Sequence, residues 1–266
     1  MKKYVMIMDV SKCNMCYNCC LSCKDEHFGR EKLPIFKGQQ ELRQNWVNLY
    51  TEERGSGSKI RITSYADHCR HCDEPKCVAA SKNGAVYKRE DGIVIIDPVK
   101  AEGQKELLDA CPHKAISWNK ESNLPQKCTF CAHLLDAGEK EPRCVEACPT
   151  GALIFGDAND PESEVSRLIR EYPEAAKGTA LYRFINMPAK FISGSVYLGD
   201  KEEVAENAEI TLLADGEVIQ ATKADGFGDF TFDDIEPDQD FVLKVSYEGY
   251  PEQTFNVNTE EDACFE

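Results

Sequence analysis

The chain has 266 residues, 42% of them hydrophobic and 29% charged, which suffices for two modest domains and is ordinary for a globular protein. Its net charge of −16 is uneven: residues 191–266 hold three lysines and no arginine against 20 Asp and Glu, which leaves residues 1–190 near neutral. This acidity argues against a nucleic-acid or anionic-membrane partner for the C-terminal part. The 14 cysteines are too few and too clustered for a disulfide scaffold.

Residues 1–12 predict a first strand that leads into a loop of cysteines. Asp9 interrupts the apolar run, which has neither a small-residue cleavage site nor a twin arginine, so we interpret it as a strand rather than a signal peptide. No window reaches the length of a membrane span. We therefore expect a cytoplasmic chain with reduced thiols, although a partner with its own export signal could carry it elsewhere.

The first cysteine run lies in residues 9–23 and has the spacing C-x-x-C-x-x-C-x-x-x-C. Three thiolates at i, i+3 and i+6 let a short loop hold one corner of a cubane, and the fourth cysteine ligates a different cluster. The run thus predicts a distant partner run, which follows in residues 128–148. Crossed ligation of the two runs gives cluster 1 (Cys13, Cys16, Cys19 and Cys148) and cluster 2 (Cys23, Cys128, Cys131 and Cys144).

Residues 24–68 form a linker-like excursion in which plausible strands flank a turn. The same rule applied to the inner cysteines gives cluster 3 (Cys69, Cys72, Cys77 and Cys111). A twin cluster would need cysteines at four positions that hold other residues (Ser81, Ala101, Gln104 and Leu107). Since one cube is whole and its twin wholly missing, the simplest account is a four-cluster plan with one site deleted. Twelve cysteines thus predict three [4Fe–4S] clusters.

Two cysteines remain. We expect Cys20 to be a packed neighbour of a ligand and Cys264 to be a free thiol near a frayed end. Between the runs, the pattern predicts a hairpin over residues 84–97 and a short helical approach to Cys111 over residues 105–110.

A further strand is predicted over residues 151–155, followed by a helix with Asp160 as N-cap and Pro161 at its first position, which ends near Tyr172. From residue 191 the apolar period changes to two. The predicted strands are Ser193–Leu198, Glu209–Leu213, Val218–Thr222, Asp229–Phe232, Phe241–Tyr247 and Thr254–Val257. Short strands at this spacing indicate a small β-sandwich. We therefore predict an α+β chain with a cluster-binding domain at 1–190 and an acidic sandwich at 191–266.

Structural zinc is the main alternative for clustered cysteines, but it favours two C-x-x-C pairs around one ion, whereas here loops of three cysteines divide evenly into cubes. The five histidines all lie in the cluster-binding part, where we expect packing or hydrogen bonding near a cluster (His27, His68, His71, His113 and His133). No Walker loop, dinucleotide fingerprint or hydrolase elbow is present, so we assign no catalytic residue.

The crossed four-run plan resembles the iron–sulfur subunits of the molybdopterin oxidoreductases related to dimethyl sulfoxide reductase. The motifs HCDEPKCVAA, ACPHKAI, KCTFCAHLL and RCVEACPTGAL carry this resemblance over about residues 1–190. Loss of one inner cluster together with an appended sandwich most resembles the small subunits of the transhydroxylases that act on pyrogallol and phloroglucinol. The C-terminal segment TKADGFGDFTFDDI is similar to prealbumin-type, carboxypeptidase-regulatory-like domains.

The resemblance implies tandem ferredoxin-like units related by a pseudo-twofold axis. It also implies electron transfer to or from a large molybdopterin subunit of the bis-guanine dinucleotide type, in a heterodimer or larger assembly that acts on hydroxylated aromatics. A catechol dehydroxylase or another molybdopterin reductase is an alternative partner enzyme. A free-standing polyferredoxin is an alternative of another class, and a carbohydrate- or surface-binding role for the sandwich is a weaker one.

Overall fold

The computed structural model describes residues 2–39, 44–178 and 180–265. The chain forms two compact units, one of Met1–Thr51 with Ser64–Met187 and the other of Glu52–Thr63 with Pro188–Glu266. The sequence pattern predicts residues 52–63 in the cluster-binding domain, whereas they belong to the second unit. Among the described residues no helix is long and apolar enough to cross a membrane.

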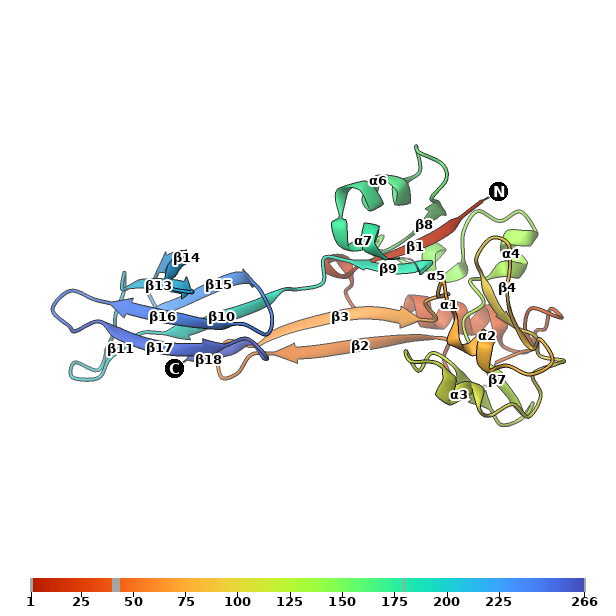
Figure 1. Ribbon diagram of the computed structural model, residues 1–266, viewed down its shortest axis with the longest axis horizontal. Helices are drawn as coiled ribbons and strands as arrows, with labels where there is room; N and C mark the ends of the chain where they lie inside the picture. The colour runs from red at the N-terminus through yellow and green to blue at the C-terminus, as the bar shows by residue number, and fades with distance from the viewer. Residues whose placement is uncertain (1, 40–43, 179, 266) are drawn as a thin grey trace. The chain divides into compact units, whose positions relative to one another are not determined.

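The first unit combines short helices with small sheets (Figure 1). Its helices are η1 (Val10–Lys12), α1 (Asn18–His27), α2 (Lys76–Ala80), α3 (Leu107–Ala110), α4 (Ala132–Asp136), α5 (Arg143–Glu146), α6 (Glu164–Glu171) and α7 (Pro173–Lys177). Its strands are β1 (Tyr4–Asp9), β4 (Val86–Lys88), β5 (Val94–Ile96), β6 (Ser117–Asn119), β7 (Leu124–Gln126), β8 (Leu153–Asp157) and β9 (Tyr182–Ile185). Two longer strands, β2 (Val47–Arg54) and β3 (Arg61–His68), pair with each other and run from the first unit into the second.

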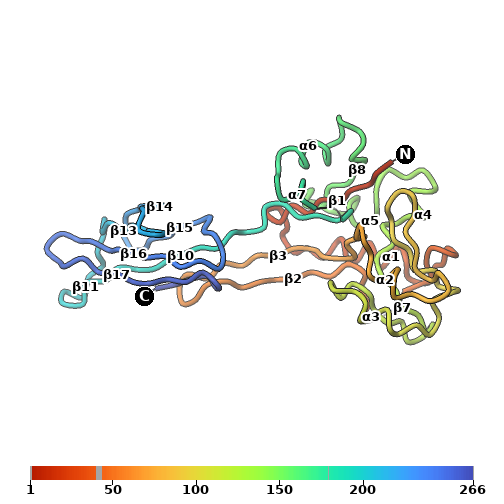
Figure 2. The backbone as a smooth tube through the Cα atoms, viewed as in Figure 1, coloured from red at the N-terminus to blue at the C-terminus, as the bar shows by residue number. Residues whose placement is uncertain are grey.

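The central sheet of the first unit has the order β8-β1-β9, with β1 antiparallel to β8 and parallel to β9. Figure 2 shows the backbone of this region as a tube, with β1 and β8 labelled. Successive side chains of a strand point to opposite sides, and consecutive residues of β1 are buried, so both faces of this strand are covered. Met6 and Met8 join the core that contains most of the cysteines. Val5 and Ile7 join a second core with residues of α6 and α7. The predicted first strand is thus the central strand of this sheet and touches both cores.

The helix predicted after residue 160 exists as α6, but its predicted start is wrong. Its N-cap is Ser163, whose side-chain oxygen accepts a hydrogen bond from the Ser166 N–H at 3.2 Å. Asp160 instead accepts the Glu162 N–H in a turn before the helix. Ser and Asp are about equally good N-caps, so composition could not choose between two candidates three residues apart. The hairpin predicted over 84–97 is confirmed as β4 and β5, which pair antiparallel.

The second unit contains two main sheets with the orders β15-β10-β18 and β14-β13-β16-β17. Its strands are β10 (Lys190–Ser195), β11 (Tyr197–Leu198), β12 (Glu203–Val204), β13 (Glu209–Ala214), β14 (Glu217–Lys223), β15 (Asp229–Ile235), β16 (Asp240–Ser246), β17 (Gln253–Asn258) and β18 (Ala263–Phe265). Inward-facing residues of both sheets share one core, among them Ile192 and Phe232 from one sheet and Leu212 and Leu243 from the other.

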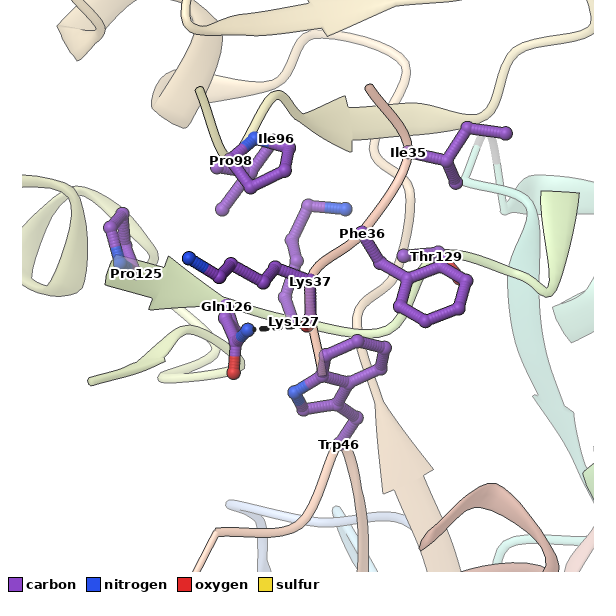
Figure 3. A pocket seen from close by; sticks show the side chains of 10 residues that line it. All are labelled: Ile35, Phe36, Lys37, Trp46, Ile96, Pro98, Pro125, Gln126, Lys127 and Thr129. Carbon is purple, nitrogen blue, oxygen red and sulfur yellow. Dashed lines mark hydrogen bonds between the residues drawn. The ribbon is translucent and has the colours of Figure 1, made fainter. Parts of the chain in front are cut away.

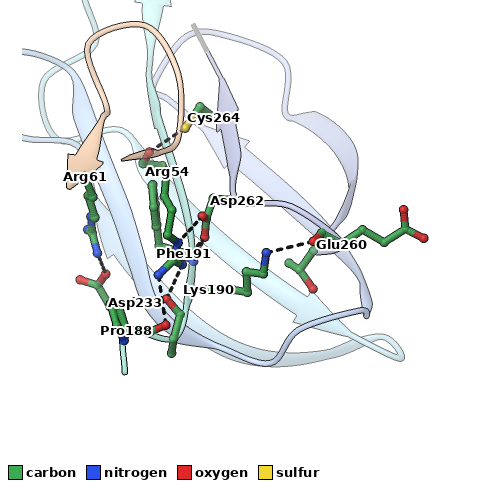
Figure 4. A network of polar contacts seen from close by, with 12 residues as sticks. Arg54, Arg61, Pro188, Lys190, Phe191, Asp233, Glu260, Asp262 and Cys264 are labelled. Carbon is green, nitrogen blue, oxygen red and sulfur yellow. Dashed lines mark hydrogen bonds and ion pairs between the residues drawn. The ribbon is translucent and has the colours of Figure 1, made fainter. Parts of the chain in front are cut away.

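Arginine side chains at the tip of the β2–β3 hairpin form ion pairs with acidic side chains of the rest of the second unit (Figure 4). Arg54 makes a two-pronged ion pair with Asp262 at 2.6 Å, and Arg61 pairs with Asp233. The Phe191 ring lies near both guanidinium groups, at 4.2 Å from Arg61 and 5.7 Å from Arg54. These pairs place residues 52–63 in the second unit.

Candidate iron–sulfur sites

The first cysteine run folds into a loop with backbone angles that suit wrapping around a ligand. Met15 and Tyr17 adopt left-handed φ values of 57° and 65°, and Tyr17 then caps α1, which carries Cys19 and Cys23. Together with Cys148, the three loop cysteines line a small cavity whose walls include Met8 and Leu153. Residues far apart in the chain therefore face the same cavity.

The thiols around this cavity influence one another. Burial, and then the charges of neighbouring thiols that include Cys148, raise the pKa of Cys13. At Cys148 burial opposes the thiolate, but N–H groups of Leu153, Ala152 and Thr150 lower the pKa below its ordinary value. Four sulfur donors with a common cavity and backbone N–H groups aimed at one of them fit an iron–sulfur cluster.

Cys23 is buried, and so are the first three cysteines of the last run (Cys128, Cys131 and Cys144). Burial, and next the charges of Cys128 and Cys131, raise the pKa of Cys23 well above its usual range. Burial is also the main cause that raises the pKa of Cys128 and of Cys131 to about 12. Such thiols deprotonate only when a cation compensates the thiolate, which iron would do.

A buried polar network holds the wall of this group together. Glu26 of α1 accepts from Arg143 of α5 at 3.0 Å and contacts His133 Nε2 of α4 at the same distance. Burial opposes the charge of Glu26, but these two partners hold its pKa below the ordinary value. Gln39 donates to the Cys23 sulfur at 3.6 Å. These contacts connect α1, which contains Cys23, with α4, which follows Cys131, and with α5, which contains Cys144.

The inner group contains Cys69, Cys72 and Cys77 from one run and Cys111 from the C-terminal end of α3. Burial, and then the charges of Cys69 and Cys111, raise the pKa of Cys72. Burial is the largest cause that raises the pKa of Cys77 to about 11, and Cys69 and Cys111 add to it. These four sulfurs are close enough to act on one another electrostatically.

The first C-x-x-C loops of the runs that begin at Cys13, Cys69 and Cys128 share one turn, which cysteine spacing alone does not predict. The residue before the second cysteine has a left-handed backbone in all three loops, at Met15, His71 and Phe130. Its N–H is directed at the first cysteine of the loop: His71 donates to Cys69 at 3.4 Å and Phe130 to Cys128 at 3.3 Å. The Met15 N–H likewise lowers the pKa of Cys13, although burial dominates there.

The two distal Cys-Pro segments also share a turn. The third residue after each cysteine is left-handed, with φ of 50° at Lys114 and 64° at Gly151. The N–H of the following residue then approaches the sulfur, at 3.4 Å for Ala115 and Cys111. N–H groups directed at ligand sulfurs stabilise the thiolate and tune cluster potentials. No residue type specifies these turns, since only one of the five left-handed positions is glycine.

The positions of the missing twin cluster hold packed side chains. Ala101 and Leu107 are fully buried in a core with residues of β4 and β5. The Gln104 side chain accepts the Lys82 N–H at 3.0 Å and donates to the Lys100 carbonyl at 2.9 Å. Ser81 donates to the Val78 carbonyl. Apolar side chains and hydrogen-bonded polar side chains thus occupy the positions where the four-cluster plan would have cysteine ligands.

All 14 cysteines are free thiols. Cys20 is buried and donates to the Val47 carbonyl at 3.2 Å, in line with a packed neighbour. Cys264 lies in β18, which pairs with β10, rather than at a frayed end. His27 and His68 are buried, and burial lowers the pKa of each to about 4, so both are neutral packing residues at pH 7.

Lys127 is a buried lysine, only 3% exposed, that the sequence alone does not single out. Its side chain lines a small pocket together with Lys37, Trp46 and Thr129 (Figure 3). A lysine next to Cys128 gives no sign of burial in the sequence, because lysines are almost always exposed.

Comparison with known proteins shows that the chain is similar to iron–sulfur proteins. The profile of a family described as a 4Fe-4S dicluster domain matches residues 60–158. The small subunit of pyrogallol hydroxytransferase from Pelobacter acidigallici is 36% identical over 262 residues, which cover 94% of this chain and 92% of that protein.

Other relatives match a shorter part of the chain. A tetrathionate reductase subunit from Salmonella typhimurium is 34% identical over 66% of each chain. A sulfite dehydrogenase subunit from Allochromatium vinosum is 34% identical over 64% of this chain and 75% of that protein. The hydroxytransferase subunit is thus similar over nearly the whole chain, and the other two over about two thirds of it.

Proposed function

The chain belongs to the iron–sulfur subunits of the molybdopterin oxidoreductases related to dimethyl sulfoxide reductase, and from this membership we propose that it carries three [4Fe–4S] clusters for a catalytic subunit that acts on hydroxylated aromatics. It is an electron-transfer subunit with [4Fe–4S] centres. When bound, such centres supply one-electron chemistry, and the chain's own residues hold them and set their potentials.

The observation that carries the proposal is the cavity lined by Cys13, Cys16, Cys19 and Cys148. Three of these residues come from one run and the fourth from a distant one, as crossed ligation requires. A single zinc ion would not need a contribution from both runs, because each run already has four cysteines. We assign these residues to cluster 1.

The electrostatic neighbours of each thiol support our assignment of the remaining ligands. The charges of Cys128 and Cys131 act on Cys23, and those of Cys131, Cys128 and Cys23 act on Cys144, which supports cluster 2. The mutual influence of the inner four supports cluster 3 (Cys69, Cys72, Cys77 and Cys111).

Repeated local geometry supports a tandem ferredoxin-like origin. The helix pairs α1–α5 and α2–α3 each contact one another and each carry or precede distal ligands. The same N–H-to-sulfur turn recurs in the three loops. In this interpretation the packed core around Ala101 and Leu107 replaces a fourth cluster.

Two features support a transhydroxylase-type partner. The relative named for pyrogallol hydroxytransferase matches 94% of the chain, including the acidic C-terminal unit, whereas the tetrathionate reductase relative matches 66%. We assign the two-sheet C-terminal unit to the prealbumin-type sandwiches. The partner is then a large catalytic subunit with a bis-guanine dinucleotide molybdopterin.

The surface around cluster 1 suits electron exchange with that partner. Cys16 is exposed, and the neighbouring Tyr17 and Leu21 side chains are 51% and 65% exposed. Exposed apolar side chains beside a redox site are typical of a docking surface.

The test is to isolate the native complex anaerobically and to measure iron and molybdenum together. We expect about twelve iron atoms per chain, four for each cubane, and a large molybdenum-containing partner. About four iron atoms per chain would refute the three-cluster assignment. Twelve iron atoms without molybdenum would favour the free-standing polyferredoxin. Turnover of a catechol by reductive loss of a hydroxyl group, without transfer between aromatics, would favour a dehydroxylase.

A further inference from the structure

Among the described residues, Lys127 is a buried cation that has no acidic partner. Its ammonium donates to two neutral acceptors, the backbone carbonyls of Val94 and of Cys128, the latter at 3.1 Å. None of the ion pairs among the described residues involves Lys127. An isolated buried charge is strongly unfavourable, so a negative group must compensate it in the working protein.

The cysteine ligands are the candidates for that negative group. Lys127 directly precedes Cys128, and its ammonium is bonded to Val94 of β5. Val94 belongs to the core against which Cys77 and Cys111 pack. The ammonium is therefore hydrogen-bonded both to the carbonyl of a cluster 2 ligand and to a strand of the core that contacts cluster 3 ligands. Its charge favours the thiolates of Cys77, Cys72 and Cys128, although burial raises the pKa of all three.

We propose that Lys127 is the internal counter-ion of the inner cluster and raises the reduction potential of cluster 3 more than those of clusters 1 and 2. This inference rests on the cluster assignment proposed above. A cubane held by four thiolates is anionic and gains one further negative charge on reduction, so a fixed cation beside it stabilises the reduced form. Lys127 forms and breaks no bond and moves no proton. It changes the equilibrium constant for adding one electron.

Burial is what makes this charge effective. The side chain of Lys127 is shielded from solvent, so counter-ions and water screen it little. Lys37 lines the same pocket but is exposed, and Figure 3 shows both side chains at the pocket wall. The two lysines carry the same charge in the same neighbourhood and differ in burial, which makes Lys37 a matched control.

The experiment is an anaerobic redox titration followed by electron paramagnetic resonance, on the iron-loaded chain in its native complex. Lys127→Met removes the charge and keeps the approximate length of the side chain. We expect at least a tenfold fall in the equilibrium constant for reducing cluster 3, which is about 59 mV for one electron. We expect a smaller fall for cluster 2 and none for cluster 1. Lys127→Arg and Lys37→Met should both keep the original potentials.

Unchanged potentials in Lys127→Met at full iron content would overturn the proposal, and so would an equal shift of all three clusters. If Lys127→Met loses cluster 3 while Lys127→Arg retains it, the charge is needed to hold the cluster and the counter-ion role stands. If both variants lose it, the shape of lysine rather than its charge matters and the role is refuted. Iron far below twelve atoms per chain in the unsubstituted protein would instead refute the three-cluster assignment.

Discussion

Removing the guanidinium of Arg54 should destabilise the second unit severely. Arg54 and Asp262 form a two-pronged ion pair whose side chains are 10% and 4% exposed. Arg54 also donates to the carbonyls of Pro188 and Ala189. In Arg54→Met, the Asp262 carboxylate would stay buried with the Phe191 N–H as its remaining described hydrogen-bond partner.

Loss of one member of a buried pair costs about 3–5 kcal/mol, because the other charge is left uncompensated. The neighbouring pair of Arg61 and Asp233 provides the control, since its side chains are 44% and 57% exposed. An exposed pair contributes about 0–1 kcal/mol, so Arg61→Met should have a small effect. Both arginines contact the Phe191 ring, so that the contrast tests burial of the ion pair.

The assay is hydrogen exchange of the β10 and β18 amides in the full-length, iron-loaded chain. A loss of about 3–5 kcal/mol in the free energy of local opening speeds exchange by a hundredfold to a few thousandfold. Equal exchange rates in Arg54→Met and Arg61→Met would refute the reasoning.

The pH dependence of this stabilisation has a definite sign. Burial of Asp262 opposes its charge, but the hydrogen bonds from Arg54 outweigh burial and lower the folded-state pKa. A lowered pKa contributes stability above the unfolded-state value of about 3.9 and loses it as the pH falls through the folded-state value. The difference between the two variants should therefore be greatest near neutral pH and shrink as acidification protonates Asp262.

Three further predictions concern the cluster domain. Cys111→Ala should remove one paramagnetic signal and leave about eight iron atoms per chain, whereas loss of an outer-pair signal would contradict the crossed assignment. Cys148→Ala should remove the cluster that Cys13→Ala also removes, and two different lost signals would contradict a shared site. Ser163→Ala should cost about 1 kcal/mol of stability in denaturant titration, because α6 loses its N-cap, and Asp160→Ala should cost less; the reverse order would contradict the cap assignment.

Much of the cluster chemistry could be predicted from the sequence, because ligand spacing is a local property of the chain. The spacing of Cys13, Cys16 and Cys19 indicates a cubane corner wherever the loop ends up in space. The strands of the second unit could also be predicted, since alternating apolar residues have one way to bury a single face. The hairpin before Asp97 followed from the same rule together with its turn residues.

Features that depend on which distant segments meet could not be predicted. Residues 52–63 have turn composition, and only the acidic partners Asp262 and Asp233 place them in the second unit. Met15 and Phe130 do not suggest left-handed turns, because the bond to a neighbouring sulfur, not residue preference, favours that conformation. Burial of Lys127 likewise depends on the position of β5, whose Val94 carbonyl accepts a hydrogen bond from the lysine. The sequence by itself thus determined which donors exist and how they are spaced, whereas the tertiary structure decided which charges and N–H groups surround them, because such contacts join residues far apart in the chain.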